Sequence, residues 1–578
     1  MKNDVLVTNL LNRQLRLEQV RAGFEDEMDL AFRYVNPRRY RTGGVQGAQR
    51  KTKMYDGVAQ DAFFDWVAGM EGWGVSENLD WHRAAISTPK LRDSDSVQRW
   101  LDEYTEQMAW EFQTGNLYEC MPEYYQDAGS GGTAVTLTEE SHDLSRCVHR
   151  VPHPGTYWIA ENDEHEIDIY HELTTMTCRQ AVEKFGGADD TLPKLIRDWS
   201  VDPQGSLWEC DFLTCICPAD DKAIFERNVT VGRKPYAAVT VLYRVSAGSG
   251  VPSDGVLTDI AAGDRLVRVQ GYDYFPATVW RFRRNSDEIY GFSPAMDVMS
   301  VIEAAQQHAY NLMNMGNFAA RPMMAVPDDK RSSFRYLPGE RFKYADEKRI
   351  PMPIPMGGEY PIAVDRENKI HDLIRKRYGY HVWNMLPLLQ QKKERVQATE
   401  VLEGRADQAR LLVGQFNNFW RGGMRPTYNN VAQIAARAGR LPAAPNVLQE
   451  YRGRDIVIPM FVGPLSVLQL QTASLGRLRG GLSLLGDVAE ILGRHVGAEE
   501  AAKIYARVRL PDLAEYICDH SFFPQQLMND DETTAAIIAA REQRAAALQE
   551  AMAAQKLAAA AGQMGKPVDE SSLLARVG

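Results

Sequence analysis

The sequence predicts an α+β fold that is mainly α-helical. Apolar residues recur three or four positions apart in long stretches near both ends and in the middle of the chain, which is typical of amphipathic helices. Between residues 120 and 285, short runs alternate apolar and polar side chains, as half-buried strands do. A chain of 578 residues is too long for one hydrophobic core, so we expect two or more packed modules.

The first half of the chain predicts helices followed by a mixed module. Residues 1–35 predict a helix, 36–53 a polar, Gly-rich and basic loop, and 54–118 further helices with a polar turn between Trp73 and Trp81. Residues 127–132 predict a turn that leads into a strand over 133–138. Residues 120–285 as a whole predict a mixed α+β module, with a short helix over 177–185.

A long helix is predicted over residues 294–320. Ser293 can cap it, and Pro294 occupies the first helical position, where a missing N–H costs nothing. The helix ends at Arg321-Pro322 and carries a narrow stripe of small and apolar residues, namely Ala295, Val298, Ile302, Ala305, Ala309 and Leu312. A proline-rich stretch follows over 321–364, and then a second helix over 365–381. This pattern indicates a structural part of the protein, not an active site.

The last third predicts further helices. Residues 382–397 are interrupted by Pro387 and predict a loop or broken helix. A long helix is expected from Thr399 to about Ala438, and its glycines weaken it or let another group approach closely. Residues 532–561 contain fourteen alanines and only a thin apolar stripe. Such a helix is poorly stabilised alone, so we expect it to pack against copies of itself.

Charge and composition restrict the function classes. The net charge of −11 argues against simple sequence-independent DNA binding, which needs a basic surface. Residues 321–395 are nevertheless basic, with sixteen Lys or Arg against ten Asp or Glu. The seven cysteines have no disulfide-like spacing, which fits a reducing cytosol. The sequence has neither a signal-peptide apolar region nor a membrane-spanning run, so we expect no membrane insertion.

Motifs for catalysis are absent or incomplete. The only Gly-Lys pair, Gly565-Lys566, is followed by proline, so no phosphate-binding loop is present and an ATP-driven motor is disfavoured. Several histidines and cysteines fall in the mixed module, but their spacing matches no zinc motif. They are His142, His149, His153, His165, His171, Cys210, Cys215 and Cys217. We expect no cofactor, and a metal-dependent hydrolase or nuclease on 120–285 stays an alternative.

Four stretches of the chain form a recognisable series. They are residues 54–81; Gly291-Phe-Ser-Pro294 with its helix, Arg321-Pro-Met-Met-Ala-Val-Pro-Asp328 and Leu337-Pro-Gly-Glu340; Ala398-Thr-Glu-Val401 through Leu411-Leu-Val-Gly414 to Gly439-Arg-Leu-Pro442; and Gly463-Pro-Leu-Ser466 through Gln469 with the Ala-rich tail. Together they resemble one family, the portal or head-to-tail connector proteins of short-tailed, podovirus-type bacteriophages. Each motif alone is weak, whereas their order and spacing make chance unlikely. The resemblance covers most of residues 25–560.

The resemblance implies a non-enzymatic ring, usually of about twelve subunits, at one vertex of a capsid. It also implies the portal fold. Its regions would be a wing over 1–293, stem helices over 294–320 and 365–381, a clip over 321–364, a tunnel loop over 382–397, a wing helix and return segment over 398–500, and a crown or barrel over 501–578.

The resemblance further implies partners and contact residues. Double-stranded viral DNA would pass through the ring during packaging and ejection. The large terminase subunit would dock first and tail adaptor or nozzle proteins later, beside major capsid and scaffolding proteins. Lys392, Lys393 and Arg395 are then expected to face the channel, and Arg331, Arg335 and Lys343 to contact partners at the clip. The protein would be made in the host bacterial cytoplasm and end in the virion. A scaffold or internal virion protein without a ring is the second alternative.

Overall fold

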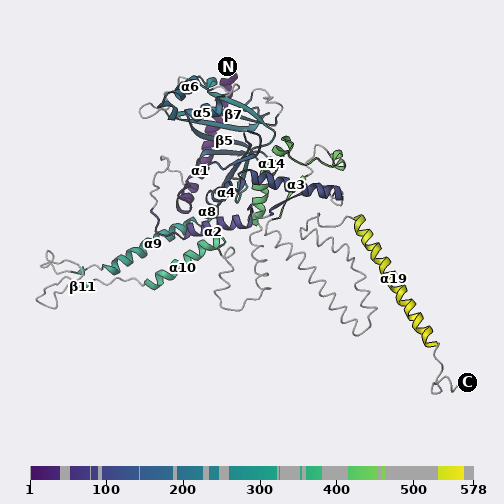
Figure 1. Ribbon diagram of the computed structural model, residues 1–578. Helices are drawn as coiled ribbons and strands as arrows, with labels where there is room; N and C mark the ends of the chain where they lie inside the picture. Colours follow the sequence, from purple (N-terminus) through teal and green to yellow (C-terminus); the bar gives the residue numbers. More distant parts are fainter. Residues whose placement is uncertain are drawn as a thin grey trace. The chain divides into compact units, whose positions relative to one another are not determined.

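The structure is a computed structural model that describes residues 2–39, 53–77, 80–88, 91, 94–141, 143–186, 192–225, 234–246, 260–321, 324–325, 352–353, 360–380, 414–451, 457–462 and 531–564. The chain divides into two compact units. The first comprises residues 1–84, 104–442 and 459–477, and the second comprises 85–103, 443–458 and 478–578. The mixture of helices and sheets agrees with the predicted α+β class (Figure 1).

Four helices dominate the first 131 residues: α1 (Lys2–Val35), α2 (Val58–Trp73), α3 (Asp95–Thr114) and α4 (Leu117–Gly131). The helix expected over 1–35 is confirmed. The expectation of helices throughout 54–118 is wrong at β1 (His82–Ile86), which forms a two-stranded sheet with β12 (Val457–Phe461). Because its partner lies far along the chain, β1 has no local hairpin signal.

The turn expected over residues 127–132 is wrong, because α4 continues to Gly131 and only Gly132, with φ of +77°, leaves the helix. The small residues serve close packing instead. A Cβ atom on Gly129 would lie 2.4 Å from the Trp66 ring, and one on Gly131 would lie 2.8 Å from the Phe32 ring. Glycine therefore lets α4 approach the aromatic side chains of α2 and α1.

Two antiparallel sheets form the predicted mixed module. The three-stranded sheet has the order β3 (Cys147–Arg150), β2 (Thr133–Glu140), β9 (Ala277–Arg281). The five-stranded sheet has the order β4 (Tyr157–Glu161), β5 (Ile167–Thr177), β6 (Glu209–Pro218), β7 (Tyr236–Ser246), β8 (Leu266–Tyr272). The strand expected over 133–138 is confirmed as part of β2.

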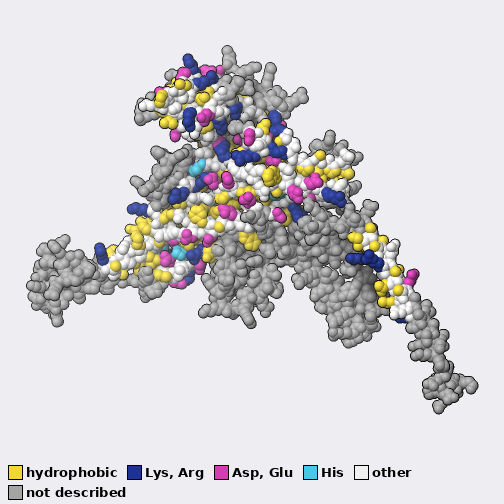
Figure 2. All heavy atoms as spheres, in the orientation of Figure 1, with side chains coloured by type: hydrophobic (Ala, Val, Ile, Leu, Met, Phe, Trp, Pro, Cys, Tyr) yellow, Lys and Arg dark blue, Asp and Glu magenta, His cyan; other side chains and the backbone are white. Residues whose placement is uncertain are grey.

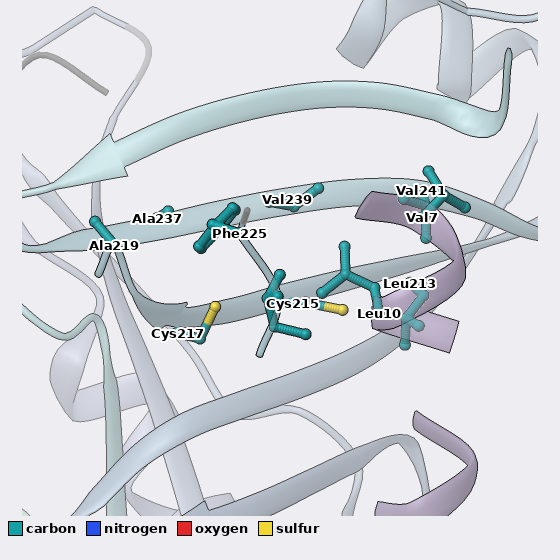
Figure 3. Close-up of a cluster of buried hydrophobic side chains, with 11 residues drawn as sticks. Val7, Leu10, Leu213, Cys215, Cys217, Ala219, Phe225, Ala237, Val239 and Val241 are labelled. Atoms are coloured by element: carbon teal, nitrogen blue, oxygen red, sulfur yellow. The ribbon is translucent and has the colours of Figure 1, made fainter. Parts of the chain in front are cut away.

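Alternate residues of β6 enter different cores, as the pleat of a strand requires. Leu213, Cys215 and Cys217 belong to one core together with Val7 and Leu10 of α1 (Figure 3). The even-numbered Cys210 and Phe212 belong instead to a core with α5 (Cys178–Phe185) and α6 (Lys194–Val201). Both faces of the sheet are thus covered. The sequence predicted α5, which Thr177 caps as part of a capping box, but not α6.

The remaining regular elements are short turns of helix and the later helices. The 3₁₀ turns are η2 (Pro154–Thr156), η3 (Gly205–Leu207), η4 (Ala262–Arg265) and η8 (Asn446–Tyr451). A π-helix, η7 (Phe419–Met424), leads into α14 (Arg425–Arg437). In the second unit, α19 (Asp531–Met564) contains the predicted Ala-rich helix and extends slightly beyond it.

Candidate functional site: a helical hairpin and its root

A helical hairpin is the feature of the first unit that the sequence associates with function. It consists of α9 (Met299–Ala320) and α10 (Tyr360–Arg377), which pack side by side (Figure 1). At their far ends, β10 (Met324–Ala325) pairs antiparallel with β11 (Met352–Pro353), so the chain leaves along α9 and returns along α10. With 1.5 Å per residue, α9 is about 33 Å long.

The start of the hairpin follows the predicted capping chemistry. The Ser293 hydroxyl accepts a hydrogen bond from the Met296 N–H at 3.2 Å, and Pro294 occupies the first helical position. The helix is not continuous as expected, since α8 (Pro294–Asp297) ends in a break at Val298 before α9 begins. The helix predicted from residue 365 begins five residues earlier, at Tyr360, because Pro361 is tolerated in the first turn.

The root of the hairpin is a turn at Tyr55 and Asp56, just before α2. The Gln306 side chain of α9 accepts hydrogen bonds from the Tyr55 N–H at 2.8 Å and the Asp56 N–H at 3.2 Å. Its amide nitrogen donates to the Asp56 carbonyl at 2.6 Å. From α10, His371 Nε2 lies 2.6 Å from Asp56 Oδ2. Both helices are therefore fastened to one turn.

Further polar contacts hold the two helices in register. His308 Nε2 of α9 lies 2.8 Å from the Ala363 carbonyl of α10. Near the root, the Asp297 carboxylate forms ion pairs with both Arg377 of α10 and Arg283, which follows β9. These contacts explain how a two-helix projection keeps a defined direction relative to the sheets of the same unit.

The far half of α9 is only partly covered by the described residues. Met299, Ile302, Ala305 and Gln306 are buried, but no later residue of α9 is. Apolar side chains gather at this surface (Figure 2): Tyr310 is 38%, Met313 47% and Phe318 40% exposed. Of the predicted stripe, Ala309 and Leu312 are half-buried. An apolar surface of this kind is typical of a contact with another protein surface.

The contact residues predicted for the tunnel loop and the clip lie outside the described residues. They are Lys392, Lys393 and Arg395 in the loop, and Arg331, Arg335 and Lys343 in the clip. After residue 380, the described chain resumes at residue 414, in a helix that contains η7. Sequence reasoning missed this π-helix. A Cβ atom on Gly423 would lie 3.0 Å from the Tyr124 hydroxyl, which agrees with the prediction that a glycine here permits a close approach.

The histidines and cysteines of the mixed module are mostly structural. His149 and His171 are buried, and burial lowers the pKa of His149 to about 4 and that of His171 to about 3. His171 Nδ1 lies 2.9 Å from Gln14 Oε1 and 3.6 Å from the Cys215 sulfur. Within the described residues, no three His, Cys, Asp or Glu side chains gather as metal ligands would.

Comparison with known proteins identifies the family. Residues 7–508 match the family described as "Bacteriophage head to tail connecting protein". The chain belongs to this family. It is 25% identical over 500 residues to the portal protein of Salmonella phage epsilon15, covering 83% of each chain. It is 23% identical over 471 residues to the probable portal protein of Bordetella phage BPP-1, covering 80% of this chain and 79% of that one.

The predicted resemblance to portal or head-to-tail connector proteins is thereby confirmed. The family match includes the hairpin and its root. It ends before α19, so the Ala-rich helix is outside the matched residues. Within the described parts of the chain, no helix combines the length and hydropathy that crossing a bilayer requires.

Proposed function

We propose that the protein is a structural, non-enzymatic portal subunit that forms a ring at one vertex of a phage capsid. Viral double-stranded DNA would pass through the ring during packaging and again during ejection. The observation that carries this proposal is the hairpin of α9 and α10, which is fastened at one end and has exposed apolar side chains at the other, as far as the described residues go. The family match supports it.

A closed ring provides the missing cover for α9. Ring contacts are heterologous, so one face of each subunit fits a different face of the next. Tyr310, Met313 and Phe318 would form one such face, and the neighbouring subunit would cover it. Burying apolar area stabilises by roughly 25 cal/mol per Å², and a ring repeats this gain at every interface.

We propose that the regions of the chain correspond to those of portal proteins. The wing would be 1–293, the stem 294–320 and 365–381, the clip 321–364, the tunnel loop 382–397, and the wing helix with its return segment 398–500. Residues 501–578 would form the crown or barrel, in which copies of α19 pack together. All described side chains of α19 are exposed in the single chain, so they are available for such contacts.

The channel would be mostly acidic. Twelve chains of net charge −11 would carry about −130 charges, which repel DNA phosphates and let the duplex slide. Lys392, Lys393 and Arg395 would then provide weak cationic contacts in the tunnel loop. Replacing all three with alanine should leave ring formation intact and change the yield or retention of packaged DNA. If packaging is unchanged, these three residues do not contact DNA in the way proposed.

The clip would bind the partners. The large terminase subunit would dock there during packaging and tail adaptor or nozzle proteins afterwards, while major capsid and scaffolding proteins would surround the wing. Changing Arg331, Arg335 and Lys343 to alanine should weaken terminase binding in a pull-down with purified rings. Normal binding by intact variant rings would contradict this role. The finished ring would reside in the virion after synthesis in the host bacterial cytoplasm.

The barrel assignment has its own test. A chain that ends before Asp530 lacks α19 entirely. If α19 serves only the barrel, this shortened chain should still form rings, seen by electron microscopy, without the projection that α19 copies would make. Loss of all oligomers would show that α19 is needed for ring assembly itself.

A further inference from the structure

Two cysteine thiols meet inside the core between the five-stranded sheet and α5. The sulfur atoms of Cys178 and Cys210 lie 3.4 Å apart, and both residues are fully buried. Cys178 is the first residue of α5, directly after β5 ends at Thr177. Cys210 lies on β6 opposite Met176 of β5. The pair therefore connects two neighbouring strands at the point where one of them becomes a helix.

This pair differs from the other cysteines of the described chain. Cys215 contacts His171, and Cys120 donates to the His149 carbonyl at 3.3 Å. Of the six cysteines that the structure describes, only Cys178 and Cys210 bring two sulfur atoms together. The proposed portal function does not use this contact.

The two thiols are chemically unequal. A hydrogen bond from the Cys210 thiol lowers the pKa of Cys178, and the N-terminus of α5 also favours a thiolate at that position. The same hydrogen bond raises the pKa of Cys210, and burial raises it further. Because Cys178 is the first residue of α5, the helix N-terminus makes it the better nucleophile of the two.

We propose that Cys178 and Cys210 form a thiol–disulfide couple that a small peroxide closes. The Cys178 thiolate attacks one oxygen of hydrogen peroxide, which breaks the O–O bond, releases hydroxide and leaves a sulfenic acid. The Cys210 sulfur then attacks the Cys178 sulfur, and the S–O bond breaks. The hydroxyl leaves with the Cys210 proton as water. Overall, two thiols and one peroxide give one disulfide and two waters, and each sulfur is oxidised by one electron.

Forming the disulfide bond requires little movement of the two side chains. The sulfur atoms need to move from 3.4 Å to the usual disulfide length of about 2.05 Å. The new bond would close a loop that contains α5, α6 and η3. Constraining this loop in the unfolded chain would raise the stability of the fold. Small oxidants are favoured, because the buried sulfurs exclude bulky disulfide reagents.

The test uses the full-length protein, treated with hydrogen peroxide and then with catalase. The protein is denatured, its free thiols are alkylated, and its peptides are mapped by mass spectrometry without reduction. We expect a linked peptide pair that joins Cys178 to Cys210, while Cys217 of the same strand is alkylated. Reduction before alkylation should abolish the link. Alkylation of both residues after oxidation, or separate sulfinic acids on them, would overturn the proposal.

Variants provide the matched control. Oxidation should raise the thermal denaturation midpoint of the wild type and of Cys217→Ala by roughly 5 °C, but not that of Cys210→Ala. Cys217 is a suitable control because it is buried on β6 in the other core. An equal rise in Cys210→Ala would also overturn the proposal. If that variant fails to fold, the wild-type peptide map still decides. Neither result depends on ring formation.

Discussion

The Asp56 carboxylate, just before α2, contacts the His371 side chain of α10, with Oδ2 and Nε2 2.6 Å apart. This contact joins the start of α2 to α10. The second carboxylate oxygen of Asp56 accepts a hydrogen bond from the Val58 N–H at 2.8 Å, so one side chain both orders the entry to α2 and holds the hairpin. Gln306 binds the same turn from α9. The direction of the hairpin is therefore set at its root, although His371 of α10 lies 315 residues from Asp56 along the chain.

Removing this carboxylate should loosen the hairpin. Asp56→Ala leaves His371 and the Val58 N–H without their acceptor, which should cost about 1.5–3 kcal/mol of stability. Hydrogen exchange should speed up over α10 and the first turn of α2. The control is Asp372→Ala, because Asp372 is exposed and lies next to His371 on α10. This variant should change neither the stability nor the hydrogen exchange. Equal exchange in both variants would contradict the role given to Asp56.

The contact of α4 with α2 should not tolerate a methyl group. Gly129→Ala would place a Cβ atom 2.4 Å from the Trp66 ring, so the helices must separate or the ring must move. We expect a loss of about 1–3 kcal/mol in the free energy of unfolding by denaturant titration. Gly72→Ala on α2 meets nothing within 4 Å and should be neutral or stabilising by up to about 1 kcal/mol. Equal effects would mean that the helices do not pack this closely.

The buried His82 should make stability fall in mild acid. Burial lowers its pKa from 6.5 to about 4, so between these values the unfolded chain binds a proton that the folded chain does not. Stability is thus complete above about pH 6.5 and declines toward pH 4, by at most about 1.4 kcal/mol per pH unit for this residue.

His82→Phe should flatten that decline, because the ring already lies among Trp81, Phe112 and Tyr428. Thermal denaturation midpoints measured from pH 7.5 to 4.5 give the comparison. Leu207→Ala, a change at an exposed residue that carries no titratable group, is the control and should follow the wild type. A His82→Phe curve parallel to the wild type would show that His82 takes up its proton equally in both states.

The uncovered face of α9 should govern assembly. Changing Met313 and Phe318 together to glutamate would place charges where we propose that a neighbouring subunit packs. Ring mass in sedimentation velocity should fall, while the stability of the single chain should change by about 0.5 kcal/mol or less, since both side chains are exposed there. Val201→Glu, 84% exposed on α6, is the control. If the double variant still forms intact rings, this surface is not part of the contact between neighbouring subunits.

Local signals in the sequence predicted several elements well. Ser293 and Pro294 mark the helix start that the structure has, and Thr177 marks that of α5. The alternating pattern of β2 and the alanines of α19 likewise gave the correct element types. In each case, the deciding interactions lie within a few residues of one another, and the sequence displays them directly.

Long-range packing explains what sequence reasoning missed. Gly129 and Gly131 predicted a turn, but the rings of Trp66 and Phe32 require small residues inside a helix there. The roles of Gln306 and His371 depend on the turn at Asp56, which no local pattern connects to them. The contact residues proposed for the clip and tunnel loop follow from the family resemblance alone and lie outside the described chain.

The most direct test of the portal proposal is the mass and shape of the purified protein, by light scattering and electron microscopy of single particles. A ring of twelve 65.1 kDa chains would weigh about 780 kDa and display a central hole. We expect this particle at micromolar or higher concentration. A protein that stays a 65.1 kDa monomer at high concentration, with or without capsid and scaffolding partners, would contradict the account.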